Sequence, residues 1–140
     1  MSNRTLAIIK PDAVGNGYTG KIMDRIIGGG FTIKAARLMH LSREQAEGFY
    51  AVHKERPFYN DLVDFMTSGP CMPMALEKDD AVQSFRTLIG ATNPAEADEG
   101  TIRKDFAESV QNNAVHGSDS DENAQKEIAF FYSSDEILEY

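Results

Sequence analysis

Apolar residues occur along the chain in short continuous runs that alternate with stretches of helical spacing. The runs predict four strands, at residues 5–9, 31–41, 71–76 and 114–116. Apolar residues three or four positions apart predict helices at residues 22–27, 42–50, 58–66, 79–89, 101–106 and 118–131. The segment 91–100 has no apolar periodicity and is expected to be a loop.

Polar residues mark the ends of several of these helices. Ser42, with Gln45 three positions later, forms the pattern of a capping box. Glycines 28–30 end the first helix, and Arg56-Pro57 separates the second helix from the third. The other expected caps are Asp79 or Asp80, Thr101, and Ser118 or Ser120.

The order of elements predicts one α+β domain over residues 1–140. Strand, helix, strand, helical hairpin, strand, helix, long loop, strand and helix follow one another. Two halves of this kind are typical of a ferredoxin-like antiparallel four-stranded sheet covered by helices. The helical hairpin at residues 42–66 is then an insertion between the second and third strands.

Composition narrows the class of protein. Apolar residues make up 41% of the chain, but no apolar run approaches the roughly 18 residues that a membrane span needs. The N-terminal residues lack the apolar core and cleavage site of a signal peptide. Cys71 is the only cysteine, so no disulfide can form within the chain. We therefore expect a soluble cytoplasmic protein with no membrane partner.

The net charge of −8 is concentrated at the end of the chain. Residues 1–104 contain 13 acidic and 13 basic side chains, whereas residues 105–140 contain nine acidic side chains and Lys126 alone as a base. An acidic surface argues against nucleic-acid binding, which needs basic patches. A small phosphorylated ligand is still compatible if Lys10, Arg86 and Arg103 converge.

The segment Gly15 to Lys21 matches two nucleotide-binding patterns incompletely. Gly15, Gly17 and Gly20 satisfy G-x-G-x-x-G, but residues 10–12 separate them from the strand. With Lys21 the segment also approaches the phosphate loop of NTPases, yet Ile22 stands where a hydroxyl would hold magnesium. A turn that needs positive φ before a helix explains these glycines more simply.

One of the three histidines stands in an unusual setting. His40 and His53 have the surroundings expected of structural or surface side chains. His116 lies in the segment NAVHGSDS, next to a glycine that would open space beside its ring. Hydroxyl and carboxylate groups nearby could fix its tautomer.

Three separated motifs resemble the nucleoside diphosphate kinase family. They are AIIKPDA at residues 7–13, TIRKDF at residues 101–106 and NAVHGSDS at residues 113–120. RPF at residues 56–58, GATNP at residues 90–94 and EIAFF at residues 127–131 extend the similarity over nearly the whole chain. Such motifs in this order are not generic.

The resemblance implies an enzyme that transfers the γ-phosphoryl group of a nucleoside triphosphate to a nucleoside diphosphate. His116 would be the nucleophile in a ping-pong reaction, with Glu127 and Ser118 orienting its ring. The implied nucleotide-binding residues are Lys10, Tyr50, Arg86, Thr92 and Arg103 for the phosphates, Asn113 with Lys10 for the ribose, and Phe58, Leu62 and Val110 for the base. Stacking on Phe58 reads no base edge, so broad base and sugar tolerance follows.

The resemblance also implies a metal and an assembly. Mg²⁺ would be bound mainly through nucleotide phosphates. Family members form tetramers or hexamers built from dimers. Glu99 and residues 121–123 depart from the usual family pattern, in segments that concern loop stiffness and assembly. Two other readings stay open: a P-loop or dinucleotide-binding protein that uses Gly15 to Lys21, and a non-catalytic ferredoxin-like module in which His116 is structural.

Overall fold

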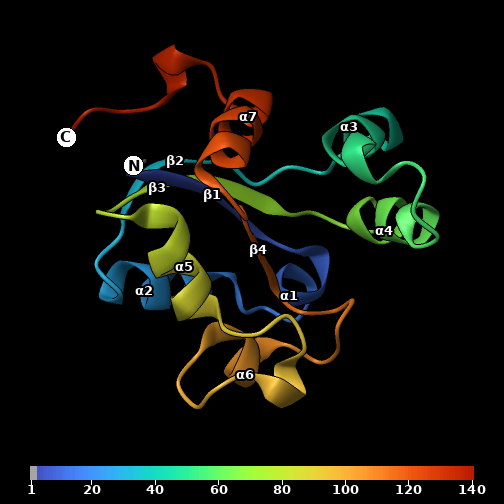
Figure 1. Ribbon diagram of the computed structural model, residues 1–140, viewed down its shortest axis with the longest axis horizontal. Helices are drawn as coiled ribbons and strands as arrows, with labels where there is room; N and C mark the ends of the chain where they lie inside the picture. Colours follow the sequence, from blue (N-terminus) through green and yellow to red (C-terminus); the bar gives the residue numbers. More distant parts are fainter. Residues whose placement is uncertain (1–2) are drawn as a thin grey trace.

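The computed structural model describes residues 3–140, which form a four-stranded antiparallel sheet with helices on both faces (Figure 1). The strands are β1 (Arg4–Ile9), β2 (Thr32–Ala36), β3 (Met72–Glu77) and β4 (Val115–Gly117). They lie in the order β2-β3-β1-β4, and every pair of neighbours is antiparallel. This confirms the predicted α+β, ferredoxin-like sheet. The extent of the domain, residues 1–140, stays a prediction.

The predicted helices are all present among residues 3–140, together with the short additional helices α1, η1, η2 and η3. The helices are α1 (Pro11–Gly15), α2 (Thr19–Gly28), α3 (Arg43–Phe49), η1 (Ala51–His53), α4 (Tyr59–Met66), α5 (Ala81–Ile89), η2 (Pro94–Glu96), α6 (Ile102–Phe106), α7 (Asp121–Phe131) and η3 (Ser134–Glu136). The pattern of apolar residues does not predict the helix α1. The proline at its first position suits a helix start, because that N–H would have no partner in any case.

Alternation along β1 divides the core between the two faces of the sheet. Ala7 and Ile9 pack with α2 and α5, whereas Leu6 and Ile8 pack with α3, α4 and α7. All four side chains are fully buried. Figure 1 shows α7 on one side of the sheet and α2 and α5 on the other. Because successive residues of a strand point to opposite faces, β1 joins both halves of the core.

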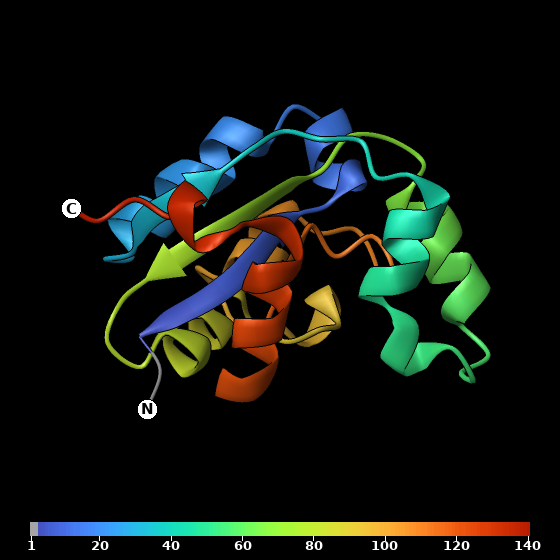
Figure 2. The ribbon, with the colours of Figure 1, turned by 90° about the horizontal axis from the view of Figure 1, so that it is seen from above.

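The helical hairpin forms as predicted and extends from one end of the sheet (Figure 2). Its first helix begins with the expected capping box. Ser42 Oγ accepts a hydrogen bond from the Gln45 N–H at 3.1 Å, and the Ser42 N–H donates to Gln45 Oε1 at 2.8 Å. Both bonds satisfy amide groups that the helix itself leaves unpaired. The capping box thus fixes the residue at which the hairpin begins after β2.

The second strand is shorter than predicted. Its pairing with β3 stops at Ala36 opposite Met74, and Met39 forms only an isolated bridge to Cys71. The next residue of β3 is Pro73, which has no N–H to donate, so the ladder is interrupted. A bulge at Lys34 also shifts the register of β2.

One of the expected helix caps is wrong. Asp80 occupies the N-cap position of α5, but its backbone is left-handed, with φ of 51°, and its side chain caps no N–H. An effective cap needs extended backbone, which brings the side-chain oxygen over the first turn. Ser120 has that conformation, and its Oγ accepts from the Asn123 N–H at 3.1 Å. Thr101 likewise caps α6, through the Lys104 N–H.

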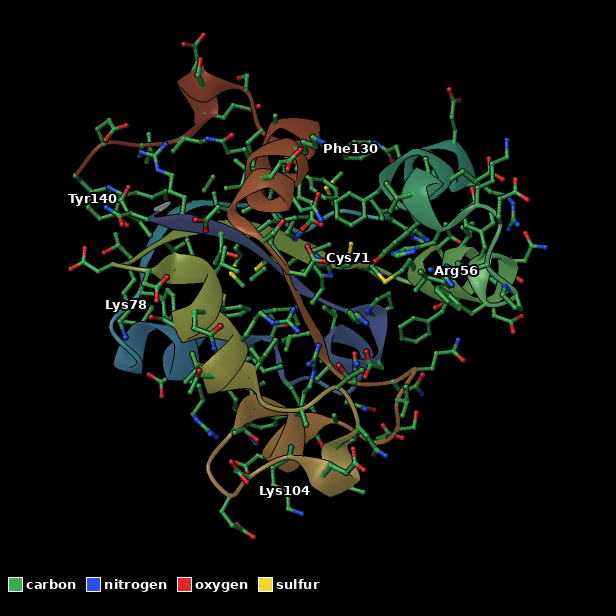
Figure 3. All side chains as sticks on the ribbon, viewed as in Figure 1. Arg56, Cys71, Lys78, Lys104, Phe130 and Tyr140 are labelled. Carbon is green, nitrogen blue, oxygen red and sulfur yellow. The ribbon has the colours of Figure 1, made fainter. Side chains whose placement is uncertain are left out.

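The C-terminal residues lie along the open edge of β2. The Leu138 N–H donates to the Lys34 carbonyl at 3.0 Å, and Lys34 Nζ donates to the Tyr140 carbonyl at 2.7 Å. Tyr140 is labelled in Figure 3, at the opposite end of the molecule from Arg56 of the hairpin. The tail therefore lies far from the end of the sheet that carries the hairpin.

Candidate active site

His116 lies on β4 and faces the helices α3 and α7. It is paired across the sheet with Ile8, and directly opposed residues of antiparallel strands point to the same face. Its Nε2 forms a hydrogen bond of 2.8 Å with Glu127 Oε1, which projects from α7. The same oxygen accepts a hydrogen bond of 2.8 Å from Ser118 Oγ. The structure therefore brings together the three residues predicted to act at the nucleophile.

This arrangement selects one tautomer of the imidazole. An ionised carboxylate only accepts hydrogen bonds, so Nε2 must carry the proton that Glu127 accepts. The lone pair is then on Nδ1, and no hydrogen bond within residues 3–140 involves that atom. Ser118 is fully buried, and its hydroxyl anchors the same carboxylate oxygen. The ring thus presents a free nucleophilic nitrogen with its other nitrogen fixed.

An aromatic cluster lies against the same ring. Phe49, near the end of α3, makes an edge contact with His116, at 5.7 Å between ring centroids and 75° between planes. Phe49 also contacts Tyr50, Phe130 and Phe131. Figure 3 labels Phe130 on α7, on the side that faces α3. A cavity of about 320 Å³ opens between these helices and is lined by Phe49, Phe130, His116 and Glu127.

Gly117 has a different role from the one expected. A Cβ at this position would lie 2.8 Å from Phe85 Cδ2 and 3.2 Å from Ile89 Cδ1, both in the core. The glycine therefore does not leave room beside the histidine ring. It lets α5 pack closely under β4, on the face opposite His116, because a side chain there would collide with Phe85.

A second and larger cavity contains the predicted base-binding residues. It has a volume of about 550 Å³, which is within the range of small-molecule sites. Five of the residues predicted to bind nucleotide line it: Lys10, Phe58, Leu62, Thr92 and Val110. Phe58 and Val110 are about half exposed, at 48% and 55%. They are available to a ligand and do not form part of the core.

Two polar residues of this cavity were not predicted. Asp61 and Gln111 line it beside the apolar groups. Asp61 stands three positions after Phe58 and one before Leu62, at the start of α4, so helical spacing brings the three side chains to one side. That spacing could have indicated Asp61. Gln111 lies in a segment without regular structure, where no periodicity signals which side chains face inward.

The basic residues predicted to hold phosphates lie close enough to affect one another. Burial and the nearby Arg103 guanidinium together lower the pKa of Lys10 to about 8, and the Asp12 carboxylate partly opposes them. Burial, together with Arg86, lowers the pKa of Arg103 to about 10. Arg86 itself is exposed on α5. Three cations thus lie near one another, with the Asp12 carboxylate close to Lys10. Such a group of positive charges would stabilise a bound anionic ligand.

Hydrogen bonds fix two members of this group. Arg103 donates to the Gly90 carbonyl at 3.0 Å and to the Val115 carbonyl at 2.9 Å. Lys10 Nζ donates to Asn113 Oδ1 at 2.8 Å, and both side chains are buried. The Arg103 guanidinium is therefore tied directly to the strand that carries His116. Lys10 and Asn113 are positioned by each other.

Tyr50 and the remaining histidines are placed differently. The Tyr50 side chain is buried, and its hydroxyl has no hydrogen-bond partner among the described residues. Burial raises its pKa above the ordinary value, with Cys71 and Glu127 adding to the effect. His40 is exposed and bonds to the Thr67 carbonyl. His53 packs between the rings of Tyr50 and Phe58, so it is a structural neighbour of the site.

The glycine-rich segment forms a turn between two short helices. Gly15 ends α1, Gly17 has φ of +79°, and Gly20 lies inside α2. The helix α1 separates this segment from β1, and β1 has antiparallel neighbours on both sides. A dinucleotide-binding unit requires parallel strands joined by the helix. The structure therefore agrees with the interpretation of these glycines as a turn before a helix. None of residues 15–21 lines either of the two cavities described above.

Comparison with known proteins places this chain in a family. The sequence model described as nucleoside diphosphate kinase matches residues 3–137. The chain is 59% identical over 135 residues to the nucleoside diphosphate kinase of Maricaulis maris, with 96% of each chain covered. It is 62% identical to that of a Nitratiruptor species, covering 96% of this chain and 98% of the relative.

Solved structures give the same result. The fold superimposes on the Aquifex aeolicus nucleoside diphosphate kinase with a TM-score of 0.95 at 47% identity, covering 97% of this chain and 99% of that one. A nucleoside diphosphate kinase from Halobacterium salinarum in complex with CDP gives a TM-score of 0.94 at 37% identity. That alignment covers 100% of this chain and 93% of the other.

Proposed function

Because the chain belongs to the nucleoside diphosphate kinase family of enzymes, which transfer phosphate between nucleoside tri- and diphosphates, we propose that it does so through a phosphohistidine at His116. The observation that carries this proposal is the bond between His116 Nε2 and Glu127 Oε1, which leaves the lone pair on Nδ1. In the first half-reaction, Nδ1 forms a bond to the γ-phosphorus as the bond to the diphosphate oxygen breaks. In the second, an acceptor diphosphate oxygen displaces Nδ1 and regenerates the free histidine.

Glu127 and Ser118 support both steps without touching the phosphoryl group. The imidazole ring gains positive charge as Nδ1 bonds to phosphorus, and the Glu127 carboxylate on Nε2–H stabilises that charge. The Ser118 hydroxyl keeps the carboxylate in place. No separate base is needed, because Nδ1 carries a lone pair and no proton in this tautomer.

The two cavities and the cations supply the rest of the site. We assign the base to the cavity between Phe58 and Val110, with Leu62 on its wall. Lys10, Arg86, Thr92 and Arg103 hold the phosphates, and Asn113 with Lys10 contacts the ribose. Tyr50, which lines the cavity that contains His116 and Glu127, is also assigned to the phosphates. The CDP complex of the Halobacterium relative supports a nucleotide ligand for this fold.

Magnesium is proposed to enter with the nucleotide. Among residues 3–140, no group of three or more His, Cys, Asp or Glu side chains is arranged to hold a metal ion. Mg²⁺ favours substrate phosphates and water over a site made of protein ligands alone. When bound there, the ion would neutralise charge on the phosphates, next to the Lys10 and Arg103 cations.

Parallel lines in initial-rate plots test the ping-pong route. Double-reciprocal plots at several fixed concentrations of the acceptor diphosphate should have equal slopes, because product leaves before the second substrate binds. Lines that intersect would indicate a complex of both substrates and would contradict a phosphohistidine intermediate.

We expect the enzyme to tolerate all common bases. Phe58 and Val110 offer stacking and packing surfaces, and stacking accepts any base because every base has a π-face. The values of kcat/KM for ATP, GTP, CTP and UTP as donors should therefore lie within roughly a hundredfold of each other. A wider spread would show that a polar group of the cavity, such as Asp61 or Gln111, reads a base edge.

Nucleotide affinity should depend on the charge of Lys10. Since burial holds its pKa near 8, the free protein loses this charge as the pH rises from 7 to 9.5, and binding of a nucleotide at pH 9 should take up a proton. Titration calorimetry in two buffers of different ionisation enthalpy measures that uptake. In Lys10→Arg the guanidinium stays charged, so the uptake should disappear. Equal uptake by both proteins would assign the proton to another group.

Assembly is proposed to follow the family, as a tetramer or hexamer built from symmetric dimers. Sedimentation at micromolar concentration should show a multiple of two chains. Nine of the last 36 residues are acidic and one is basic, so association should strengthen with moderate salt if this region lies near an interface. A monomer at every salt concentration would contradict the proposal.

The helices of the structure bear on a membrane location. No helix among residues 3–140 has the length and hydrophobicity to cross a membrane. The cytoplasmic location stays a prediction.

A further inference from the structure

Ala114 has a backbone conformation that alanine rarely adopts. Its φ is +72°, and apart from Asp80 it is the only described residue other than glycine with positive φ. The Val115 N–H donates to the Asn113 carbonyl at 2.8 Å, across Ala114. A hydrogen bond over three residues with positive φ at the centre is a strained γ-turn. Strain of this kind persists only where surrounding groups hold it.

The turn is buried, so protein groups must supply the hydrogen bonds that hold it in place. The Ala114 carbonyl accepts a hydrogen bond of 2.8 Å from the Lys10 N–H. The Ala114 N–H donates to Asp12 Oδ2 at 3.1 Å. Ala114 is fully buried beside Ala13, so the N–H would lose its partner if this carboxylate were absent. Asp12 is thus the only side chain among the described residues that pairs with the turn at its strained centre.

The turn lies between two parts of the active site. Asn113 precedes Ala114 and is bonded to Lys10 Nζ, and His116 follows two positions later. A change of φ at Ala114 to the ordinary negative range would rotate the peptides on both sides. Asn113 and the start of β4 would then move relative to Glu127, whose place is set by α7. The γ-turn therefore fixes the distance between the ribose-binding group and the nucleophile.

We propose that Asp12 is a positioning residue that holds the Ala114 γ-turn and, through it, sets His116 and Asn113 in register with the bound nucleotide. The proposal rests on the function proposed above. Asp12 touches neither His116 nor the residues of the larger cavity in any hydrogen bond of residues 3–140. Its charge also acts on Lys10, whose pKa it raises, but its part in the turn is to accept one hydrogen bond. A neutral acceptor of the same shape should therefore serve for the turn.

Four variants separate this role from its alternatives. Asp12→Ala removes the acceptor. Asp12→Asn keeps an amide oxygen for the Ala114 N–H, removes the charge and puts an NH2 group in place of the buried Oδ1. Ala114→Gly allows positive φ without strain, so the double variant Asp12→Ala/Ala114→Gly should regain the turn in part. Asp24→Ala is the matched control, because it removes a carboxylate from the exposed face of α2.

The expected kinetics follow from a misplaced nucleophile. Asp12→Ala should lower kcat by about 10²-fold, since a displacement near 1 Å is enough for such a loss. Asp12→Asn should stay within about threefold of the wild type, and the double variant should exceed Asp12→Ala by about tenfold or more. Asp24→Ala should be unchanged. An Asp12→Asn variant as slow as Asp12→Ala, or a double variant with no recovery, would overturn the proposal.

A second measurement does not depend on the chemistry. Hydrogen exchange of the Ala114 and Val115 amides, measured by NMR without nucleotide, reports the turn directly. Exchange should be at least about tenfold faster in Asp12→Ala than in the wild type and close to wild type in Asp12→Asn. Unchanged exchange in Asp12→Ala would overturn the proposal even if transfer by His116 is established. If the exchange data agree but no phosphohistidine forms in the wild type, only the proposed function fails.

Discussion

Replacing His116 by alanine is expected to lower kcat for phosphoryl transfer by at least about 10⁴-fold. The variant loses the atom that forms the bond to phosphorus, so no other interaction in the site can compensate for it. Nucleotide affinity should change only a few-fold, because the base cavity and the cations come from other elements. Steady-state transfer from ATP to GDP measures the first effect, and equilibrium binding of a nucleotide measures the second.

Two controls make the result specific to the nucleophile. His40→Ala should retain wild-type activity, because His40 is exposed and bonds only to the Thr67 carbonyl. Glu127→Gln should be intermediate, since an amide oxygen still accepts from Nε2 but carries no charge to stabilise the phosphorylated ring. A His116→Ala variant that transfers phosphate within tenfold of the wild type would exclude the proposed role.

The second large effect is expected at Arg103. Arg103→Ala should lower kcat/KM by roughly 10²–10³-fold, because a buried cation at a developing phosphate charge is removed. It should also lower the free energy of unfolding by about 1–3 kcal/mol, since the Gly90 and Val115 carbonyls lose their donor. Activity assays and denaturant unfolding measure the two effects separately.

Two further variants decide how Arg103 acts. Arg103→Lys should recover little, because one ammonium group cannot bond to both carbonyls and face the phosphates as a planar guanidinium does. Lys104→Ala is the matched control on the same helix. Lys104 is exposed and points away from the site (Figure 3), so its loss should change activity by less than about twofold. If Lys104→Ala is as damaging as Arg103→Ala, the effect belongs to the stability of α6.

Much of the fold follows from patterns that are local in the sequence. The capping box at Ser42 and Gln45 needs only two residues at fixed spacing, and it forms as predicted. The continuous apolar run at residues 5–9 predicts a buried strand, and β1 is an inner strand that contacts both halves of the core. Asp80 shows where local patterns fail as predictors. Its residue type suits an N-cap, but its left-handed backbone keeps the side chain from capping α5.

Without the family resemblance, the sequence predicts less of the candidate site than of the fold. Without the resemblance, core packing is the favoured interpretation of Phe58 and Val110, and the fold shows instead that they line a cavity together with Lys10. Gly117 was assigned to the histidine, whereas its constraint comes from Phe85, more than 30 positions away in the sequence. The γ-turn at Ala114 has no sequence signal, because alanine is not a residue that positive φ favours. Such features depend on contacts between distant segments.

The central claim is that phosphate is carried by His116, and isolation of the phosphorylated protein tests it most directly. The wild type should be incubated with γ-labelled ATP and magnesium and then freed of nucleotide. The label should remain on the chain, withstand alkali, be released by acid and pass to added GDP. His40→Ala and His53→Ala should be labelled in the same way, and His116→Ala should carry no label. Label that persists in His116→Ala, or label on the wild type that GDP cannot discharge, would contradict the account.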